Sequence, residues 1–139
     1  FLQIAVGTLM IVLTLAVQVS LFSVASDSFR KTSHWIGKGA HRRKRVIVLF
    51  CLTLWLLAGI FFAACLWSFL YLRVGEFQAL EQALYFCMVV FTTLGFGDIV
   101  LSENWRLSSA VMAANGLILF SLNTAFLIDM MRRLENESE

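Results

Sequence analysis

Long uncharged stretches alternate with short polar ones along the chain, and their lengths predict its layout. Residues 1–26, 46–72 and 107–128 contain no charged side chain. At 1.5 Å per residue these stretches would form helices of about 39, 40 and 33 Å, each longer than the hydrocarbon core of a bilayer, which is about 30 Å thick. We therefore expect three transmembrane helices.

A fourth apolar run, residues 83–91, is too short to cross a membrane. Together with the residues before it, this run predicts a helix over 77–91 that reaches about 22 Å, only part-way through a bilayer. Polar residues lie on both sides of it, so the chain is expected to leave the membrane on the side from which it entered. The return leg is residues 92–98, and residues 99–105 form an outer segment.

Basic residues are concentrated between the first two apolar stretches, in residues 27–45. We interpret this segment as a cytoplasmic loop, in which Gly37 and Gly39 interrupt any long helix. With Arg132 and Arg133 it places nine basic residues on one side against two on the other, which predicts an outside N-terminus and a cytoplasmic C-terminus, including the tail 134–139, in a multi-pass cell-membrane protein. A second interpretation is that the basic cluster binds anionic lipid or a regulator.

The polar residues inside the long helices suggest their surroundings. The first helix carries Gln3, Gln18, Ser20 and Ser23, and we expect most of its surface to face lipid as an anchor. Trp67 and Tyr71 stand near the outer end of the second helix, where aromatic belts form at the membrane boundary.

The composition agrees with a membrane protein and gives no sign of an enzyme. The chain has 139 residues, of which 60% are hydrophobic, and its mean hydropathy is +0.82, values far from those of a soluble domain. Its three cysteines lie in apolar runs and are read as small hydrophobic residues. Both histidines, His34 and His41, lie in the basic segment, with no carboxylate or cysteine at catalytic or metal-ligand spacing. We therefore expect no enzymatic activity.

The stretch that follows the short apolar run is Thr92-Thr93-Leu94-Gly95-Phe96-Gly97-Asp98. Its two glycines alternate with larger residues, so a non-helical backbone can turn its carbonyls to one side. Such backbone is tolerated at membrane depth only when it is buried in protein or lines a water-filled path. The pattern indicates that this stretch lines an ion path and that its own carbonyls are the ligands.

These seven residues resemble the potassium-channel signature, Thr-Thr-Val-Gly-Tyr-Gly-Asp in its commonest form. The order of outer helix (46–72), pore helix (77–91), filter (92–98) and inner helix (106–131) is that of the family's pore domain. We therefore expect an all-α membrane protein with a pore domain over 46–133, preceded by an additional transmembrane helix (1–26) and the basic loop (27–45).

The resemblance implies a homotetramer that conducts potassium selectively and passively. Carbonyls of Thr93, Leu94, Gly95 and Phe96 would form successive oxygen rings that replace the hydration shell of K⁺, with Gly97 completing the filter. One chain would supply a quarter of each ring. K⁺ is then the transported ion, no cofactor is expected, and the partners are other copies of the chain and membrane lipids, with no nucleic acid.

The resemblance also suggests which residues support the filter: Thr92, Asp98 and Tyr85. Tyr85 is expected either to donate a hydrogen bond to Asp98 behind the filter or to pack at the membrane boundary. Leu94 and Phe96 are expected to point away from the ion path and to pack behind it. Phe96 replaces the usual tyrosine and lacks the hydroxyl that would tie the filter to the pore helix.

The inner helix is expected to line a cavity on one helical stripe, with Thr124 and Leu127 beside it. The stripe consists of Ser109, Met112, Gly116, Phe120 and Asn123. Within it, Asn123, together with Thr124, would hydrate the cavity. Gly116 is either the hinge of an inner gate or a site of close approach between helices.

Two further polar residues of the inner helix lie off this stripe. Asn115 is expected to bond a neighbouring helix, and Asp129 to lie at a solvated helix end, paired with Arg132 or Arg133.

Two other functions remain open from the sequence. A weakly selective cation channel would use the same filter, and a non-conducting membrane subunit or scaffold would explain the extra first helix and basic loop. The chain has no arginine repeated at every third position, the pattern of a voltage sensor, and the gating stimulus is left open.

Overall fold

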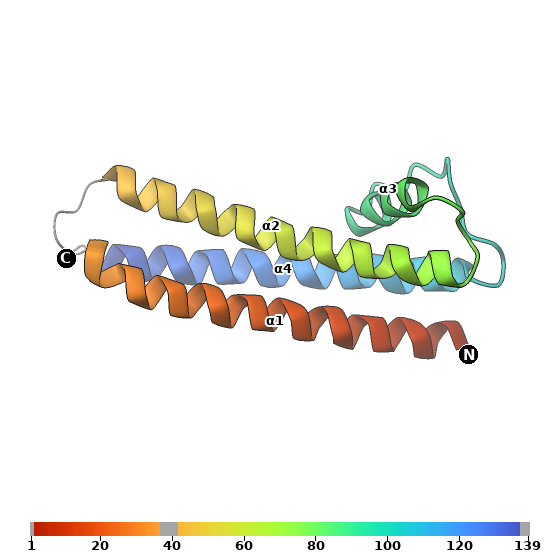
Figure 1. Ribbon diagram of the computed structural model, residues 1–139, viewed down its shortest axis with the longest axis horizontal. Coiled ribbons are helices and arrows are strands. Elements are labelled where there is room, and N and C mark those ends of the chain that lie inside the picture. Colours follow the sequence, from red (N-terminus) through yellow and green to blue (C-terminus); the bar gives the residue numbers. More distant parts are fainter. Residues whose placement is uncertain (1, 37–41, 137–139) are drawn as a thin grey trace.

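The computed structural model describes residues 2–36 and 42–136, and within them the chain forms four helices and no strand. Three long helices, α1 (Leu2–Ile36), α2 (Arg42–Arg73) and α4 (Arg106–Asn136), lie side by side (Figure 1). The short α3 (Leu80–Phe91) lies against α2 and α4 near the end of the bundle that holds the N-terminus. Leu2–Ser28, Val46–Arg73 and Arg106–Leu134 are each long and apolar enough to span a membrane, which confirms the predicted all-helical architecture.

The helices extend beyond the apolar stretches that predicted them. Most of the segment 27–45 is helical rather than a loop, since α1 continues to Ile36 and α2 begins at Arg42. Lysine and arginine are good helix formers, and a helix already started gains one hydrogen bond with each further residue, so charge alone does not end it. α1 ends directly before Gly37, while Gly39 and the rest of 37–41 lie outside the described residues.

The pore helix is shorter than expected, because it begins at Leu80 and not at Phe77. Gly75 has a φ of +81°, which reverses the chain after α2, and Ala79 is still extended with φ −119° and ψ 137°. The twelve residues of α3 reach about 18 Å, again part-way through a bilayer.

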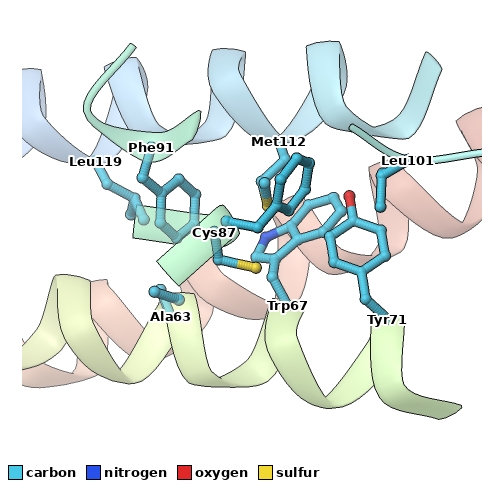
Figure 2. Close-up of a cluster of buried hydrophobic side chains, with 10 residues drawn as sticks. Ala63, Trp67, Tyr71, Cys87, Phe91, Leu101, Met112 and Leu119 are labelled. Atoms are coloured by element: carbon cyan, nitrogen blue, oxygen red, sulfur yellow. The ribbon is translucent and has the colours of Figure 1, made fainter. Parts of the chain in front are cut away.

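The main core lies where α2, α3 and α4 meet (Figure 2). Trp67 and Tyr71 from α2, Cys87 and Phe91 from α3, and Met112 from α4 point toward one another there and are completely buried. The expectation that Trp67 and Tyr71 form a lipid-facing belt is therefore wrong. They lie on the side of α2 that the short helix covers, and they fix α3 against the bundle.

The first helix packs against the bundle along one face, while most of its residues are exposed or partly exposed on the single chain, so the prediction that most of its surface faces lipid is not contradicted. Thr14 and Gln18 are each only 1% exposed, since α1 packs against both α4 and α2. Glycines make this approach close. A Cβ placed on Gly7 would lie 2.8 Å from Cγ1 of Val111, and one placed on Gly59 would lie 2.6 Å from Oε1 of Gln18.

A smaller cluster holds the opposite end of the bundle together. Met130 and Leu134 of α4 are buried there against Val48, Leu49 and Leu52 of α2. Just outside it, Nε of Arg133 donates to Oδ2 of Asp129 at 2.9 Å, with both side chains about half exposed. This pairing confirms the prediction that Asp129 lies at a solvated helix end beside an arginine.

Candidate functional site: the segment after the short helix

The segment that follows α3 begins with a tight reversal of the chain at Thr92 and Thr93. The Thr92 N–H donates to the carbonyl of Met88 at 3.0 Å, and the Thr92 hydroxyl donates to the same carbonyl at 2.8 Å. The Thr93 N–H then donates to the carbonyl of Val90 at 2.9 Å. Thr92 therefore closes the C-terminal end of α3, and its expected role in supporting the filter stays a prediction.

The next two amides also point back to the helix. The N–H groups of Leu94 and Gly95 both donate to the carbonyl of Val89, at 3.1 and 3.4 Å. In contrast, the carbonyls of residues 93–96 accept no hydrogen bond from any residue that the structure describes. Backbone carbonyls normally find a partner when they are removed from water. Their freedom here leaves four consecutive oxygens available for a ligand.

The sign of φ alternates along this segment. Thr93, Gly95 and Gly97 have φ of 59°, 55° and 75°, and the residues between them, Leu94 and Phe96, have negative φ. In an ordinary extended strand, successive carbonyls point to opposite sides, and reversing every second residue is a way to bring them to one side. The alternation is the backbone property that the spacing of the two glycines predicted.

The glycines are required by conformation and not by space. A Cβ on Gly95 or Gly97 would have no heavy atom within 4 Å, yet a positive φ is strained for any residue with a side chain. Thr93 accepts this strain although it is β-branched, a combination that is rare. Such strain persists only where the surrounding structure imposes it, and it occurs mostly at functional sites.

The carboxylate at the end of the segment is held by the short helix. The Tyr85 hydroxyl donates to Oδ2 of Asp98 at 2.8 Å, which joins the middle of α3 to the end of the segment. Of the two roles expected for Tyr85, the structure shows the hydrogen bond. The ring itself is 43% exposed.

For the ion path that the sequence predicts, we expect Tyr85→Phe to shorten the periods of conduction without changing which ion is conducted. The substitution removes the only described side-chain bond to Asp98, so the segment reaches non-conducting conformations more often. Single-channel recording measures this as shorter open bursts at unchanged unitary current.

Tyr71→Phe is the matched control for Tyr85→Phe. It removes a buried hydroxyl that lies 3.1 Å from Oγ of Ser108 and has no hydrogen bond to residues 92–98 among the described contacts. It should lower the free energy of unfolding by about 1 kcal/mol and leave burst length unchanged. Equal burst lengths in all three proteins would contradict the bracing role of Tyr85.

A second tie holds the outer loop, and sequence analysis did not find it. Oε2 of Glu76, in the turn after α2, accepts the Ser102 N–H at 2.8 Å, and Oε1 accepts the Ser102 hydroxyl at 2.5 Å. This pair of bonds connects the turn before α3 to the loop that leads into α4. Both ends of the re-entrant unit are thereby anchored, and no local pattern in the sequence signals the pairing.

The base of the segment rests on α4 at Gly116. A Cβ on Gly116 would lie 2.5 Å from the carbonyl oxygen and 2.8 Å from Cα of Phe91, the last residue of α3. These are backbone atoms that cannot easily move. Of the two roles expected for Gly116, the structure therefore shows the close approach.

The stripe expected to line a cavity faces the chain's own core for much of its length. Met112 is fully buried in the main core, and Gly116 lies under Phe91. Asn123 is only 6% exposed, and it bonds Gln18 of α1 and the carbonyl of Leu56 of α2. The expectation that Asn123 hydrates a cavity is wrong, because its amide is used between helices.

The part of α4 that the single chain leaves uncovered fits a cavity wall better, and Phe120 is the member of the stripe at its edge. Phe120 is half-buried and Thr124 is exposed. The exposed face of α4 also contains Ala114, Leu117 and Ser121. Most of the predicted stripe therefore lies on a different face of α4 from the one that the single chain leaves exposed.

The two large side chains within the segment are strongly exposed on the single chain. Leu94 is 60% exposed and Phe96 is 64% exposed. Both belong to a re-entrant unit between two membrane helices, and apolar side chains there are suited to burial against protein. The single chain does not provide the packing expected behind the filter.

Comparison with known proteins supplies the family. A family model described as "Ion channel" matches residues 50–133, a range that holds α3, residues 92–98 and most of α2 and α4. No match was found among curated proteins or among solved structures. The matched range covers more than half of the chain, and α1 precedes it. The chain belongs to this ion-channel family, whose members are two-helix pore domains of the potassium-channel type, and it carries one further apolar helix at its N-terminal end.

Proposed function

We propose that four copies of the chain form a potassium-selective channel with residues 92–98 as its filter. The observation that carries the proposal is the backbone of this segment, in which the N–H groups of residues 93–95 bond α3 while the carbonyls of 93–96 have no partner among the residues that the structure describes. Potassium must lose its hydration shell to pass, and rings of carbonyl oxygens replace that shell. Thr93, Leu94, Gly95 and Phe96 would supply one quarter of each ring.

The exposed side chains support the tetramer. Leu94 and Phe96 are apolar and more than half exposed, so a neighbouring copy would bury them and brace the filter from behind. The C-terminal end of α3 adds an electrostatic contribution, because the negative end of a helix dipole favours a cation. In the proposed assembly this end faces the axis on which the four chains meet.

The charge distribution supports an orientation with the filter at the outer face of the cell membrane. Of the eleven basic residues, only Arg73 and Arg106 border the segment between the second and third spanning helices that contains residues 92–98. The other nine belong to residues 27–45 or are Arg132 and Arg133. By the positive-inside rule the side that holds these nine, and with it the C-terminus, is cytoplasmic. Binding of anionic lipid by the segment 27–45 remains a prediction.

The test is ion flux through the purified chain in liposomes under potassium and sodium gradients. We predict potassium flux far above sodium flux, and a mass of four chains for the conducting particle. Comparable fluxes of both ions would instead favour a weakly selective cation channel. A tetramer that carries no current alone would favour a non-conducting subunit, and a monomer or dimer would contradict the proposal.

A further inference from the structure

The first helix, which lies outside the range matched by the family, holds α4 through buried polar side chains. We call Thr14, Gln18, Asn115 and Asn123 the polar cluster. Asn115 lies 101 residues after Thr14 in sequence, and its Nδ2 donates to the Thr14 hydroxyl at 2.9 Å. Nε2 of Gln18 donates to Oδ1 of Asn123 at 2.6 Å. Every member of the cluster is buried.

The polar cluster joins all three long helices. Beyond Gln18, Nδ2 of Asn123 donates to the carbonyl of Leu56 in α2 at 3.3 Å. Gly59 of α2 leaves room for this arrangement, since a side chain there would meet Oε1 of Gln18. The Thr14 hydroxyl donates in turn to the carbonyl of Met10 at 2.9 Å. In a hydrocarbon environment such groups have no water to replace a lost partner, so the bonds are specific contacts and not incidental ones.

The polar cluster lies along α4 next to the residue that supports the base of residues 92–98. Asn115 and Asn123 lie on the two sides of Gly116 in sequence, and Gly116 is the point where α4 meets the backbone of Phe91. Phe91 is followed at once by the reversal at Thr92 and Thr93. The bonds from α1 therefore hold α4 in the same stretch that supports the base of the filter.

We propose that α1 positions the filter through α4, with Thr14 and Gln18 as the positioning residues. This inference rests on the proposed channel function and extends it to a helix that the pore itself does not require. With the bonds in place, α4 is held against Phe91. Without them, α4 shifts or tilts more freely around Gly116, and the support under residues 92–95 loosens.

The test compares the full chain with Gln18→Leu, Thr14→Val and Gln3→Leu. Gln3→Leu is the matched control, because it is the same substitution on the same helix, and Oε1 of Gln3 is buried without a partner in the described part of the chain. Interhelical hydrogen bonds in membranes correspond to about a threefold to twentyfold change in an equilibrium. We expect the open probability to change by such a factor in Gln18→Leu and Thr14→Val, at unchanged unitary current and unchanged K⁺/Na⁺ permeability ratio.

A second measurement does not depend on conduction. Hydrogen exchange at the amides of Leu94 and Gly95, which bond Val89, should accelerate by a factor of about 3–20 in Gln18→Leu and Thr14→Val and stay unchanged in Gln3→Leu. Unchanged exchange in both, or the same change in Gln3→Leu, would overturn the proposal. A wild-type chain that carries no current would count against the channel function alone, because the exchange comparison still decides the coupling.

A rescue variant separates positioning from stability. Gln18→Leu combined with Asn123→Leu replaces both bonded partners by apolar groups, which restores much of the stability lost when one partner remains unpaired. A merely structural role predicts that hydrogen exchange at the amides of Leu94 and Gly95 returns to the wild-type rate when stability is restored. The positioning role predicts that exchange at these amides stays fast in the double variant. Thr14→Val keeps the shape of the side chain and serves where the leucine variants fail to fold.

Discussion

Replacing Gly95 by alanine is expected to abolish potassium current while the protein still folds and assembles. Gly95 has a φ of 55°, and a Cβ there meets no atom within 4 Å, so the change strains the backbone without a steric clash. The strain costs about 1–2 kcal/mol in the left-handed conformation, and the residue relieves it by leaving that conformation. The carbonyl then turns away from its neighbours, and one oxygen ring is lost. Current in planar bilayers measures the effect.

Gly75→Ala is the matched control. Gly75 also has a positive φ, 81°, and also has no atom within 4 Å of the added Cβ, but it lies in the turn after α2. The two variants should therefore lose similar thermal stability, and only Gly95→Ala should lose current. Normal selective current through Gly95→Ala would refute the assignment of the filter. Loss of current in both variants would mean that strain in the outer turn, and not the carbonyl ring, controls conduction.

Gly116→Ala is expected to destabilise the protein and to disturb the filter together. Alanine is the better helix former by about 1 kcal/mol, so an unhindered site would gain stability. Here the new methyl group would lie 2.5 Å from a backbone oxygen of Phe91, and α4 must move away from α3. Overpacking of this kind costs about 1–3 kcal/mol. The temperature of thermal unfolding and the single-channel current should therefore both be lower than in the wild-type chain.

This variant also distinguishes the two roles considered for Gly116. A hinge predicts that Gly116→Ala keeps or gains thermal stability and alters only the opening and closing of the channel. The close approach predicts loss of stability. Gly7→Ala is the comparison, because the three atoms nearest to its added methyl group all belong to the Val111 side chain, the first of them Cγ1 at 2.8 Å, and none is backbone. It should lower the unfolding temperature by less than Gly116→Ala does.

The backbone of residues 92–98 was predictable from sequence because its geometry is local. Two glycines at alternate positions specify where φ becomes positive, and that pattern depends on few contacts elsewhere in the chain. The Tyr85–Asp98 hydrogen bond could be anticipated for the same reason, since the two residues are only thirteen positions apart in the sequence. The lengths of the apolar stretches likewise predicted the spanning helices.

What surrounds residues 92–98 was less predictable, because helical periodicity shows which residues share a face and not what that face meets. Asn123 was placed on a cavity wall, but α1 and α2 take its amide. Trp67 and Tyr71 were assigned to the membrane boundary, but α3 covers them. In both cases the deciding neighbour comes from a distant part of the chain, and a single sequence does not record which pairs meet.

The separation of the partners in the polar cluster has a consequence for biosynthesis. Thr14 and Gln18 enter the membrane with α1, whereas Asn115 and Asn123 are made later, with α4. Until translation reaches α4, the amide and hydroxyl groups of the earlier pair have only lipid or provisional neighbours around them. A chain cut short before α4 would keep these groups without the partners that α4 supplies, at a cost in the hydrocarbon region.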